Sequence, residues 1–298
     1  MSSPALIFDP ALLRLRRRRA AALGPATFLI DQVAQDLAER LGAVLHRFDL
    51  GADVGTPTDA VRRALKDRVG TLIAVDATAE HRRPSEVVIA GDVEALPFRD
   101  ASVDLIVSGL ALQWANDLPG ALLQIRRALK PDGLFLAALI GGETLTELRQ
   151  AFAAAETEIE AGVSPRVAPF AELRELGALL QRASFALPVV DVDRLTVRYA
   201  NPFALLHDLR RMGAGNALIE RRRTPLRRRT LMRMAEIYQE RFADPDGRVR
   251  ATFEIVWLSG WAPHPGQQQP LKPGSAQMLL ASALRARSSD DEEQTPKE

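Results

Sequence analysis

Three carboxylates follow short apolar runs of the chain, at Asp49, Asp76 and Asp92. The first opens the stretch DLGADVG, where Gly51 and Gly55 leave the backbone uncovered, so that a ligand can approach it closely. An acidic residue at the end of the next strand, roughly 20 residues after such a glycine loop, typically accepts hydrogen bonds from ribose hydroxyls. The spacing therefore predicts a nucleoside site in which Asp76 binds the ribose.

Short strands joined by helices are expected to position these carboxylates. The runs at 103–107 and 134–140 are apolar at consecutive positions, as in strands buried on both faces. Between them, Asp117 and Pro119 are typical of a helix start, and Pro131-Asp132-Gly133 of a helix end. A crossover of this kind makes the two strands parallel neighbours. Further strands are predicted at residues 44–50, 71–75, 86–90, 189–199 and 250–258, which indicates an α/β protein.

The segment from Asp92 onward resembles the second half of a class I S-adenosylmethionine-dependent methyltransferase. The resemblance rests on four short motifs in the same order as in that family: Asp92-Val93, Leu96-Pro97-Phe98, a strand ending DLIVS, and ALKPDGLF. The resemblance implies a Rossmann-like fold, with a seven-stranded, mostly parallel sheet, helices on both faces and a helical cap insertion. It also implies S-adenosylmethionine as cofactor, with Asp92 accepting from the adenine amino group and the Val93 amide meeting the ring nitrogen. A hydrogen bond to a charged acceptor contributes roughly 1.5–3 kcal/mol, which is enough to select adenine.

The first loop of that family reads acidic-x-Gly-x-Gly-x-Gly. Asp49, Gly51 and Gly55 match this pattern, and Asp53 stands where the middle glycine belongs. A carboxylate within about 4 Å of the cofactor's own carboxylate could cost up to about 4 kcal/mol at a surface-like dielectric. Three outcomes stay open: the Asp53 carboxylate weakens cofactor binding, points outward, or pairs with the cofactor's ammonium. Ser108, after the fourth strand, is also expected to line the cofactor.

Two groups within this family are similar to further stretches of the chain. The string LALQW resembles the malonyl carrier-protein methyltransferases of biotin synthesis. The segments at 141–170 and 201–218 resemble the methyltransferase-like assembly factor of respiratory complex I, and this resemblance runs from Phe8 to about Ala276. It implies hydroxylation of an arginine on the quinone-site subunit of complex I. No iron-binding triad is visible in the sequence to support oxygen chemistry.

The acceptor side of the site is expected to involve Gln113, Trp114, Glu143 and Glu147. A carboxylate suits a guanidinium because the two form paired hydrogen bonds. Catalytic residues stay unassigned. The sequence thus predicts an enzyme that modifies a protein side chain, an arginine of a complex I subunit, by hydroxylation or methylation. The alternatives are an O-methyltransferase acting on a malonyl or acyl carrier protein, and a non-catalytic assembly chaperone with a degenerate cofactor loop.

Composition excludes several other classes of chemistry. The 298 residues include no cysteine, which excludes disulfides, thiolate zinc sites and cysteine-bound iron–sulfur clusters. The four histidines show no metal-ligand spacing, so no metal site is predicted. No apolar run approaches the roughly 20 residues of a membrane span, and no secretory signal is visible. We therefore expect a cytoplasmic protein, with peripheral attachment at the inner membrane left open.

The chain is expected to divide into three parts. A basic arm at 1–26, with Arg16 to Arg19, is interpreted as a solvated helix or as an arm that folds over the cofactor or meets an acidic partner. The catalytic domain spans 27–262, with cap helices at about 200–246, and the tail at 263–298 is predicted to be largely disordered. Arginines at 221–223 and 227–229 flank the cap and suit water, an acidic protein surface or anionic lipid. Nucleic acid is not expected, since no aromatic residues are interleaved with them.

Overall fold

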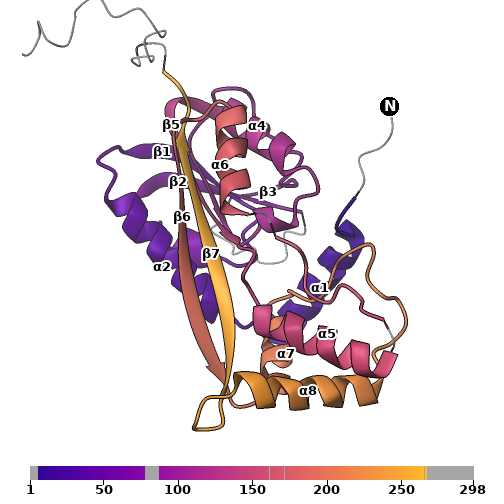
Figure 1. The fold of residues 1–298 in the computed structure, drawn as a ribbon. Coiled ribbons are helices and arrows are strands. Elements are labelled where there is room, and N and C mark those ends of the chain that lie inside the picture. Colours follow the sequence, from indigo (N-terminus) through magenta and orange to yellow (C-terminus); the bar gives the residue numbers. More distant parts are fainter. Residues whose placement is uncertain (1–5, 78–86, 161, 171, 265, 267–298) are drawn as a thin grey trace, which may run out of the picture. The chain divides into compact units, whose positions relative to one another are not determined.

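A single mixed sheet organises the protein. The computed structural model describes residues 6–77, 87–160, 162–170, 172–264 and 266 (Figure 1). It divides into a unit at 1–263 and a second at 264–298, and all that follows concerns the first. The seven strands have the order β3-β2-β1-β4-β5-β7-β6. β7 runs opposite to the other six strands, which are parallel to one another. This mostly parallel sheet confirms the predicted fold class for the described residues.

The strand boundaries agree with the prediction to within about three residues, except at the first strand and at the start of the fifth, which begins at Leu129 and includes the Pro131-Asp132-Gly133 predicted as a helix end. They are β1 (Phe48–Val54), β2 (Val69–Asp76), β3 (Val88–Ala90), β4 (Val103–Gly109), β5 (Leu129–Ile140), β6 (Ala186–Tyr199) and β7 (Val249–Trp261). The prediction of a first strand at 44–50 was wrong by four residues. Leu45 is fully exposed, whereas the run from Gly51 to Val54 is buried between β2 and β4.

Three of the described helices begin at a residue whose side chain caps them. Asp117 accepts a hydrogen bond from the Gly120 amide at 2.9 Å, and Asn201 caps a later helix in the same way. Asp9 caps the first helix through the Leu12 amide. The bounds, with η1 a short 3-10 turn after β4, are α1 (Pro10–Ala22), α2 (Phe28–Gly42), α3 (Ala60–Ala64), η1 (Leu112–Trp114), α4 (Leu118–Ala128), α5 (Thr146–Glu160), α6 (Leu173–Arg182), α7 (Pro202–Arg211) and α8 (Arg228–Phe242).

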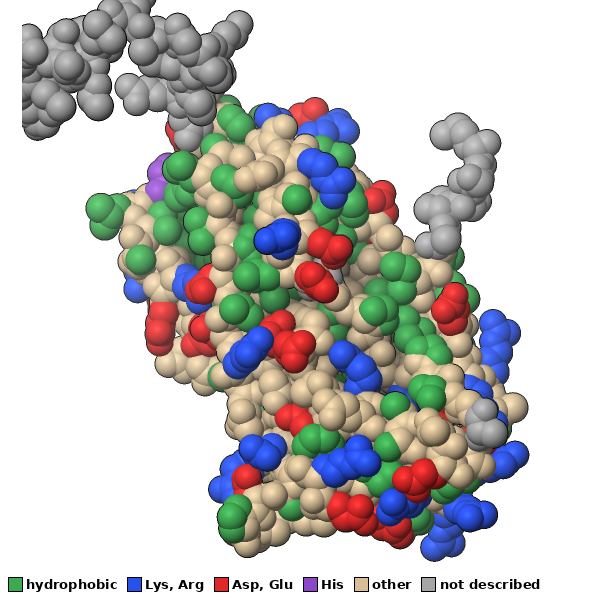
Figure 2. Space-filling view, in the orientation of Figure 1, with side chains coloured by type: hydrophobic (Ala, Val, Ile, Leu, Met, Phe, Trp, Pro, Cys, Tyr) green, Lys and Arg blue, Asp and Glu red, His purple; other side chains and the backbone are tan. Residues whose placement is uncertain are grey.

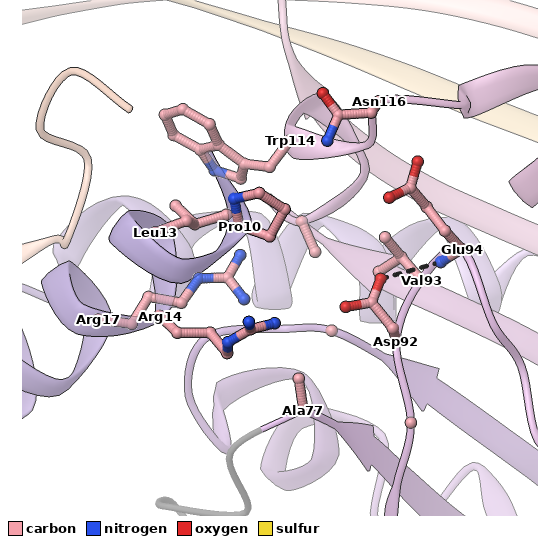
Figure 3. A pocket seen from close by; sticks show the side chains of 13 residues that line it. Pro10, Leu13, Arg14, Arg17, Ala77, Asp92, Val93, Glu94, Trp114 and Asn116 are labelled. Carbon is pink, nitrogen blue, oxygen red and sulfur yellow. Dashed lines mark hydrogen bonds between the residues drawn. The ribbon is translucent and has the colours of Figure 1, made fainter. Parts of the chain in front are cut away.

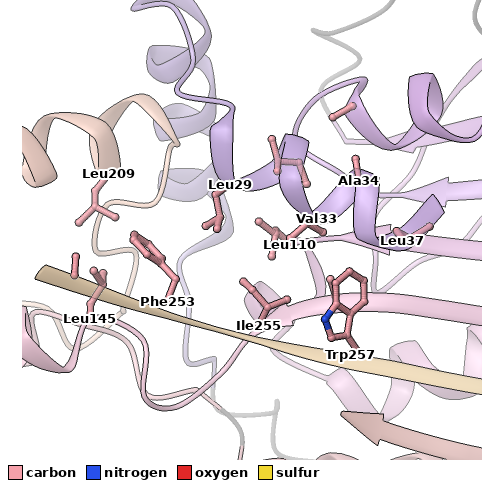
Figure 4. Close-up of a cluster of buried hydrophobic side chains, with 14 of the residues drawn as sticks. Leu29, Val33, Ala34, Leu37, Leu110, Leu145, Leu209, Phe253, Ile255 and Trp257 are labelled. Carbon is pink, nitrogen blue, oxygen red and sulfur yellow. The ribbon is translucent and has the colours of Figure 1, made fainter. Parts of the chain in front are cut away.

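Two apolar cores cover the two faces of the sheet. Successive residues of β4 alternate between them, since Leu105 and Val107 join one core and Ile106 the other. The first core contains α2, whose Leu29, Val33 and Leu37 lie near residues of β7 in Figure 4. The second contains α4 and α6. Helices on both faces hold the strand ends in fixed positions.

A helical layer extends the first core beyond the parallel strands. The long antiparallel strands β6 and β7 extend beyond the parallel strands, and α5 and α8 pack against each other beside them (Figure 1). Tyr238 of α8 donates a hydrogen bond to the Arg250 carbonyl of β7 at 2.8 Å. Among the described residues, no helix combines the length and apolar character needed to cross a membrane.

Candidate functional site

A pocket lies where the parallel strands end, and we call it the carboxyl-edge pocket. Its walls come from α1, from the turns after β1, β2 and β3, and from the segment after β4 (Figure 3). In open α/β sheets, ligands bind in a crevice at this edge. The lining residues are Pro10, Leu13, Arg14, Arg17, Gly55, Ala77, Gly91, Asp92, Val93, Glu94, Ala111, Trp114 and Asn116.

Gly55, directly after β1, packs closely against two other walls of this pocket. Gly55 has a φ of 72°, and its amide donates to the Val75 carbonyl at 2.8 Å. A Cβ at this position would meet Val93 Cγ1 at 2.8 Å and Ala111 Cβ at 3.0 Å. Only glycine therefore fits without a shift of the neighbouring walls.

The other two positions of the predicted glycine loop lie inside β1. Asp49 is exposed near the amino end of the strand, and Gly51 packs against Leu72 and Val69 of β2. Neither lines the carboxyl-edge pocket. Because the strand ends at Val54, the frame acidic-x-Gly starts at Asp53, four residues later than predicted.

When the acidic-x-Gly pattern is counted from Asp53, different residues follow its first glycine. After Asp53-x-Gly55, the positions of the second and third glycines hold Pro57 and Asp59. Pro57 has no N–H to offer a ligand. Asp59 forms an ion pair with Arg63, four residues along the same segment. Of the three glycine positions in this pattern, only the first therefore holds a glycine.

Asp53 points into the protein and pairs with an internal arginine. Its carboxylate is buried, lies 2.7 Å from Arg62 Nη1 and accepts a hydrogen bond from the Thr56 hydroxyl. Burial raises the pKa of Asp53 to about 6, although Arg62 and Thr56 act to lower it. The outward orientation was wrong, since the carboxylate is buried and its partner is Arg62 of α3.

Thr56 and Ser108 join β1 to the end of β4. Thr56 Oγ1 accepts from the Gly109 amide at 2.9 Å, and the buried Ser108 hydroxyl donates to the Val54 carbonyl at 2.8 Å. These bonds fix the two strand ends that flank the pocket. Ser108 itself does not line the pocket, so its position is that of a support for the wall.

The next two strands place carboxylates at this edge of the sheet, and of Asp76 and Asp92 only Asp92 lines the pocket. Asp76 is the last residue of β2, and Asp92 follows β3 in a tight turn closed by the Ala95 amide at 3.0 Å. The Glu94 amide donates to Asp92 Oδ1 at 3.1 Å. Facing both carboxylates is Arg17 of α1. Burial lowers the pKa of the Arg17 guanidinium, and the charges of Asp76 and Asp92 oppose that shift.

Gln113 and Trp114 lie on the segment after β4. Trp114 lines the pocket and packs edge-on against Phe8, with ring centroids 5.2 Å apart. Gln113 donates through Nε2 to the Leu110 carbonyl at 2.8 Å. Its Oε1 is buried without a hydrogen-bond partner. An acceptor in this state suits a ligand that brings an N–H or O–H group.

Glu143 and Glu147 lie away from the carboxyl-edge pocket. Glu147 is buried under α5, where its two carboxylate oxygens accept from the amide and hydroxyl of Thr252 at 3.1 and 2.5 Å. Glu143 is exposed at the turn before α5. Of the four residues predicted for the acceptor side, the structure therefore brings Trp114 into the pocket lining, but not Gln113 or these two glutamates.

The N-terminal arm forms a wall of the pocket, which the sequence offered as one of two interpretations. Asn116 Oδ1 accepts from the amides of Ile7 and Phe8, both at 2.8 Å. On the other side, the Asp9 amide donates to the Ala217 carbonyl at 2.9 Å. The arm has one apolar edge in the sequence, and the structure buries Leu13 of that edge while the neighbouring arginines are not buried.

The residues present fit a nucleoside-bearing cofactor. Asp76 and Asp92 are acceptors at adjacent strand ends, and Gly55 allows close approach between them and the segment after β4. Among the described residues, no group of three or more His, Asp or Glu side chains is arranged to hold a metal ion.

Comparisons with known proteins identify the family of this chain. Residues 52–137 match the model of the methyltransferase domain family. The chain is 37% identical over 286 residues to "Arginine-hydroxylase NDUFAF5, mitochondrial" of Danio rerio, covering 92% of this chain and 88% of the relative. It is 37% identical over 270 residues to "Malonyl-[acyl-carrier protein] O-methyltransferase" of Xylella fastidiosa, covering 86% and 89%.

A solved structure supports the fold alone. The YcgJ protein of Bacillus subtilis superposes with a TM-score of 0.53 at 17% identity, covering 76% of this chain and 98% of that one. The relatives, by contrast, match both domain and cap in sequence. This chain therefore belongs to the family of methyltransferase-fold enzymes that includes the NDUFAF5 arginine-hydroxylases and the malonyl carrier-protein O-methyltransferases.

Proposed function

We propose that this enzyme binds S-adenosylmethionine and modifies a protein side chain, an arginine of a respiratory complex I subunit or of its assembly intermediate. The observation that carries the proposal is the carboxyl-edge pocket, which Gly55 and Asp92 line, while Asp76 ends the strand next to β3. The similarity to arginine-hydroxylases over nine-tenths of the chain supports the choice of acceptor.

The nucleoside end of the cofactor would be held by the strands. Asp92 accepts from the adenine amino group, the Val93 amide faces the ring, and Asp76 accepts from ribose hydroxyls. The bound cofactor supplies an electrophilic methyl group on a sulfonium. Trp114 lines this pocket, and the acceptor side chain would enter beside its ring.

Cofactor binding is tested by calorimetric titration with S-adenosylmethionine. We expect Asp92→Ala to weaken binding roughly 10- to 100-fold, because a hydrogen bond to a charged acceptor is lost. The matched control is Asp100→Ala, which removes an exposed carboxylate paired with Arg127. Absence of binding to the unaltered protein up to millimolar ligand would instead favour the assembly chaperone.

The acceptor is tested by intact-mass analysis of complex I subunits from a strain that lacks this protein and from the same strain complemented with it. A methyl group adds roughly 14 Da and a hydroxyl group roughly 16 Da, so the two reactions are distinguished in one spectrum. Identical subunit masses in both strains would contradict the proposal.

A malonyl or acyl carrier protein is the second candidate acceptor, and the similarity to the Xylella enzyme across 86% of this chain favours it. Incubation of malonyl carrier protein with the enzyme and S-adenosylmethionine tests it directly. A gain of roughly 14 Da on the carrier protein would select this reaction over arginine modification.

The proposed partner surface is the exposed part of the arginine-rich flank of the cap. Three of its six arginines are engaged internally, since Arg221 pairs with Asp9, and both Arg222 and Arg227 pair with Glu160. Arg223, Arg228 and Arg229 are exposed. Figure 2 shows basic side chains interspersed with acidic ones over this part of the molecule. We expect this surface to meet an acidic protein partner in the cytoplasm, or anionic headgroups if the enzyme attaches peripherally to the inner membrane.

A further inference from the structure

The carboxyl-edge pocket contains charges of both signs, on opposite walls. The strand side carries Asp92 and Glu94, and Asp76 ends the neighbouring strand. Among the described residues that line the pocket, the cationic ones are Arg14 and Arg17 of α1. S-Adenosylmethionine also has two ends, because its nucleoside offers hydrogen-bond donors and its amino-acid end bears a carboxylate. The two ends therefore require opposite partners.

The turn after β1 offers little to a carboxylate. Pro57 has no N–H, and Asp59 brings a negative charge of its own. The nearby cation Arg62 is committed to Asp53 at 2.7 Å and also donates to the Thr58 carbonyl at 3.2 Å. The Thr58 hydroxyl accepts from the Ala60 amide at 3.2 Å. The anionic end of a ligand must therefore find donors elsewhere.

The arm helix presents such donors in a fixed place. Arg14 and Arg17 are three residues apart, so they project from the same face of α1. Figure 3 shows both guanidinium groups extending from α1 into the pocket, opposite Asp92. Arg14 is exposed and Arg17 is partly buried.

The backbone of the arm is held tightly on the cap. A Cβ added to Gly213, at the end of α7, would lie 3.3 Å from Arg17 Cα, so this glycine allows α1 to approach. Asn116 binds the two amides that precede α1, and the arm pairs with the segment around Leu218. Arg14 and Arg17 are thus positioned before any ligand arrives, which lowers the entropy lost on binding.

We propose that Arg14 and Arg17 bind the carboxylate at the amino-acid end of the cofactor, a role that rests on the cofactor proposed above. The arm helix then replaces the missing glycine amides of the first loop as the anion-binding part of the site. Arginine suits this task because its guanidinium is always charged and matches a carboxylate with two parallel hydrogen bonds.

The test compares two ligands that differ only at the amino-acid end. S-Adenosylhomocysteine carries the carboxylate, and 5′-methylthioadenosine has the same nucleoside and sulfur without it. We expect the double variant Arg14→Gln/Arg17→Gln to bind S-adenosylhomocysteine roughly 10- to 100-fold more weakly in calorimetry, with unchanged affinity for 5′-methylthioadenosine. Arg19→Gln, an exposed position of the same helix, is the control that leaves both affinities unchanged.

Each other outcome overturns the inference in a recognisable way. Equal weakening of both ligands would mean that the arginines only shape the pocket, and the unfolding temperature of the double variant shows whether the arm has detached. Tighter binding of both ligands would mean that the arginines compete with the nucleoside for Asp76 and Asp92. Failure of the unaltered protein to bind either ligand would overturn the proposed cofactor, and this inference with it.

Discussion

The acidic residues at the ends of β1 and β2 have similar sequence contexts and different surroundings. Asp53 and Asp76 each lie at the end of a buried parallel strand. Asp53 turns inward to Arg62 of the following helix, whereas Asp76 ends its strand at the pocket and faces Arg17 of the arm. A carboxylate at a strand end can therefore be engaged by a cation of the following helix, as Asp53 is by Arg62, instead of facing the pocket edge.

The largest effect that separates the two positions should come from Arg62→Met. This change leaves Asp53 buried without its cation, and we expect a loss of about 3–5 kcal/mol in the free energy of unfolding. Denaturant titration measures it. Arg127→Met breaks the exposed pair with Asp100 and should cost at most about 1 kcal/mol. Similar losses in the two variants would mean that Asp53 is not stabilised by Arg62.

The pH dependence of stability should carry the signature of Asp53. Its pKa is raised from the ordinary 3.8 to about 6 on folding. The folded protein therefore binds more protons than the unfolded chain between these values, so stability falls as pH rises through this window. The two-unit shift corresponds to about 3 kcal/mol.

Asp53→Asn removes this slope while adding a cost for unpaired Arg62 that does not depend on pH. The slopes of the free energy of unfolding from pH 4 to 7, and not its levels, are therefore the quantity to compare. Equal slopes in the variant and the unaltered protein would contradict the assignment to Asp53.

Gly55→Ala tests whether the turn after β1 is a wall of the pocket. The added Cβ would crowd Val93 and Ala111, and we expect cofactor affinity to fall by about 2 kcal/mol, or roughly 30-fold, in calorimetry. Gly247 is a matched control, because its φ of 81° is similar and nothing lies within 4 Å of an added Cβ. Gly247→Ala should carry the same backbone strain and leave affinity unchanged.

The smallest effect expected is that of Asp76→Asn, which keeps the shape of the ribose acceptor and removes its charge. We expect roughly tenfold weaker binding of S-adenosylhomocysteine, equivalent to about 1.4 kcal/mol. Asp49→Asn is the informative partner. Asp49 lies exposed at the far end of β1, so its change should have no effect, and a loss of affinity there would restore the originally predicted loop.

Local signals were sufficient for most of the fold. The helix cap at Asp117, the buried runs of β4 and β5 and the β-rich edge strands each depend on neighbouring residues, and the structure confirms them. The first strand was misplaced because DLGADVG contains the acidic-x-Gly frame twice, starting at Asp49 and at Asp53. Only the pairing of Ala52 with Ile106 and Ile73 selects the second frame, and that pairing is not local.

The site was predictable only in part, for the same reason. The positions of Asp76 and Asp92 at strand ends could be predicted because each follows a short apolar run in the sequence. Arg62 was missed because its partner became clear only with the correct strand end. Glu147 was assigned to the acceptor by charge alone, whereas α5 turns it toward Thr252, on the same buried side as Ala151. Side-chain direction on a helix depends on what the helix packs against.

Because the arm packs against the cap, the pocket can be completed only after the cap has been synthesised. Arg221 and Asp9, which pair across this contact, are 212 positions apart in the chain. Ribosomes add roughly 5–20 residues per second, so the arm is synthesised roughly 10–40 s before the cap segment that it packs against. A nascent chain therefore folds its parallel strands around an open pocket edge, and the two arginines reach it last.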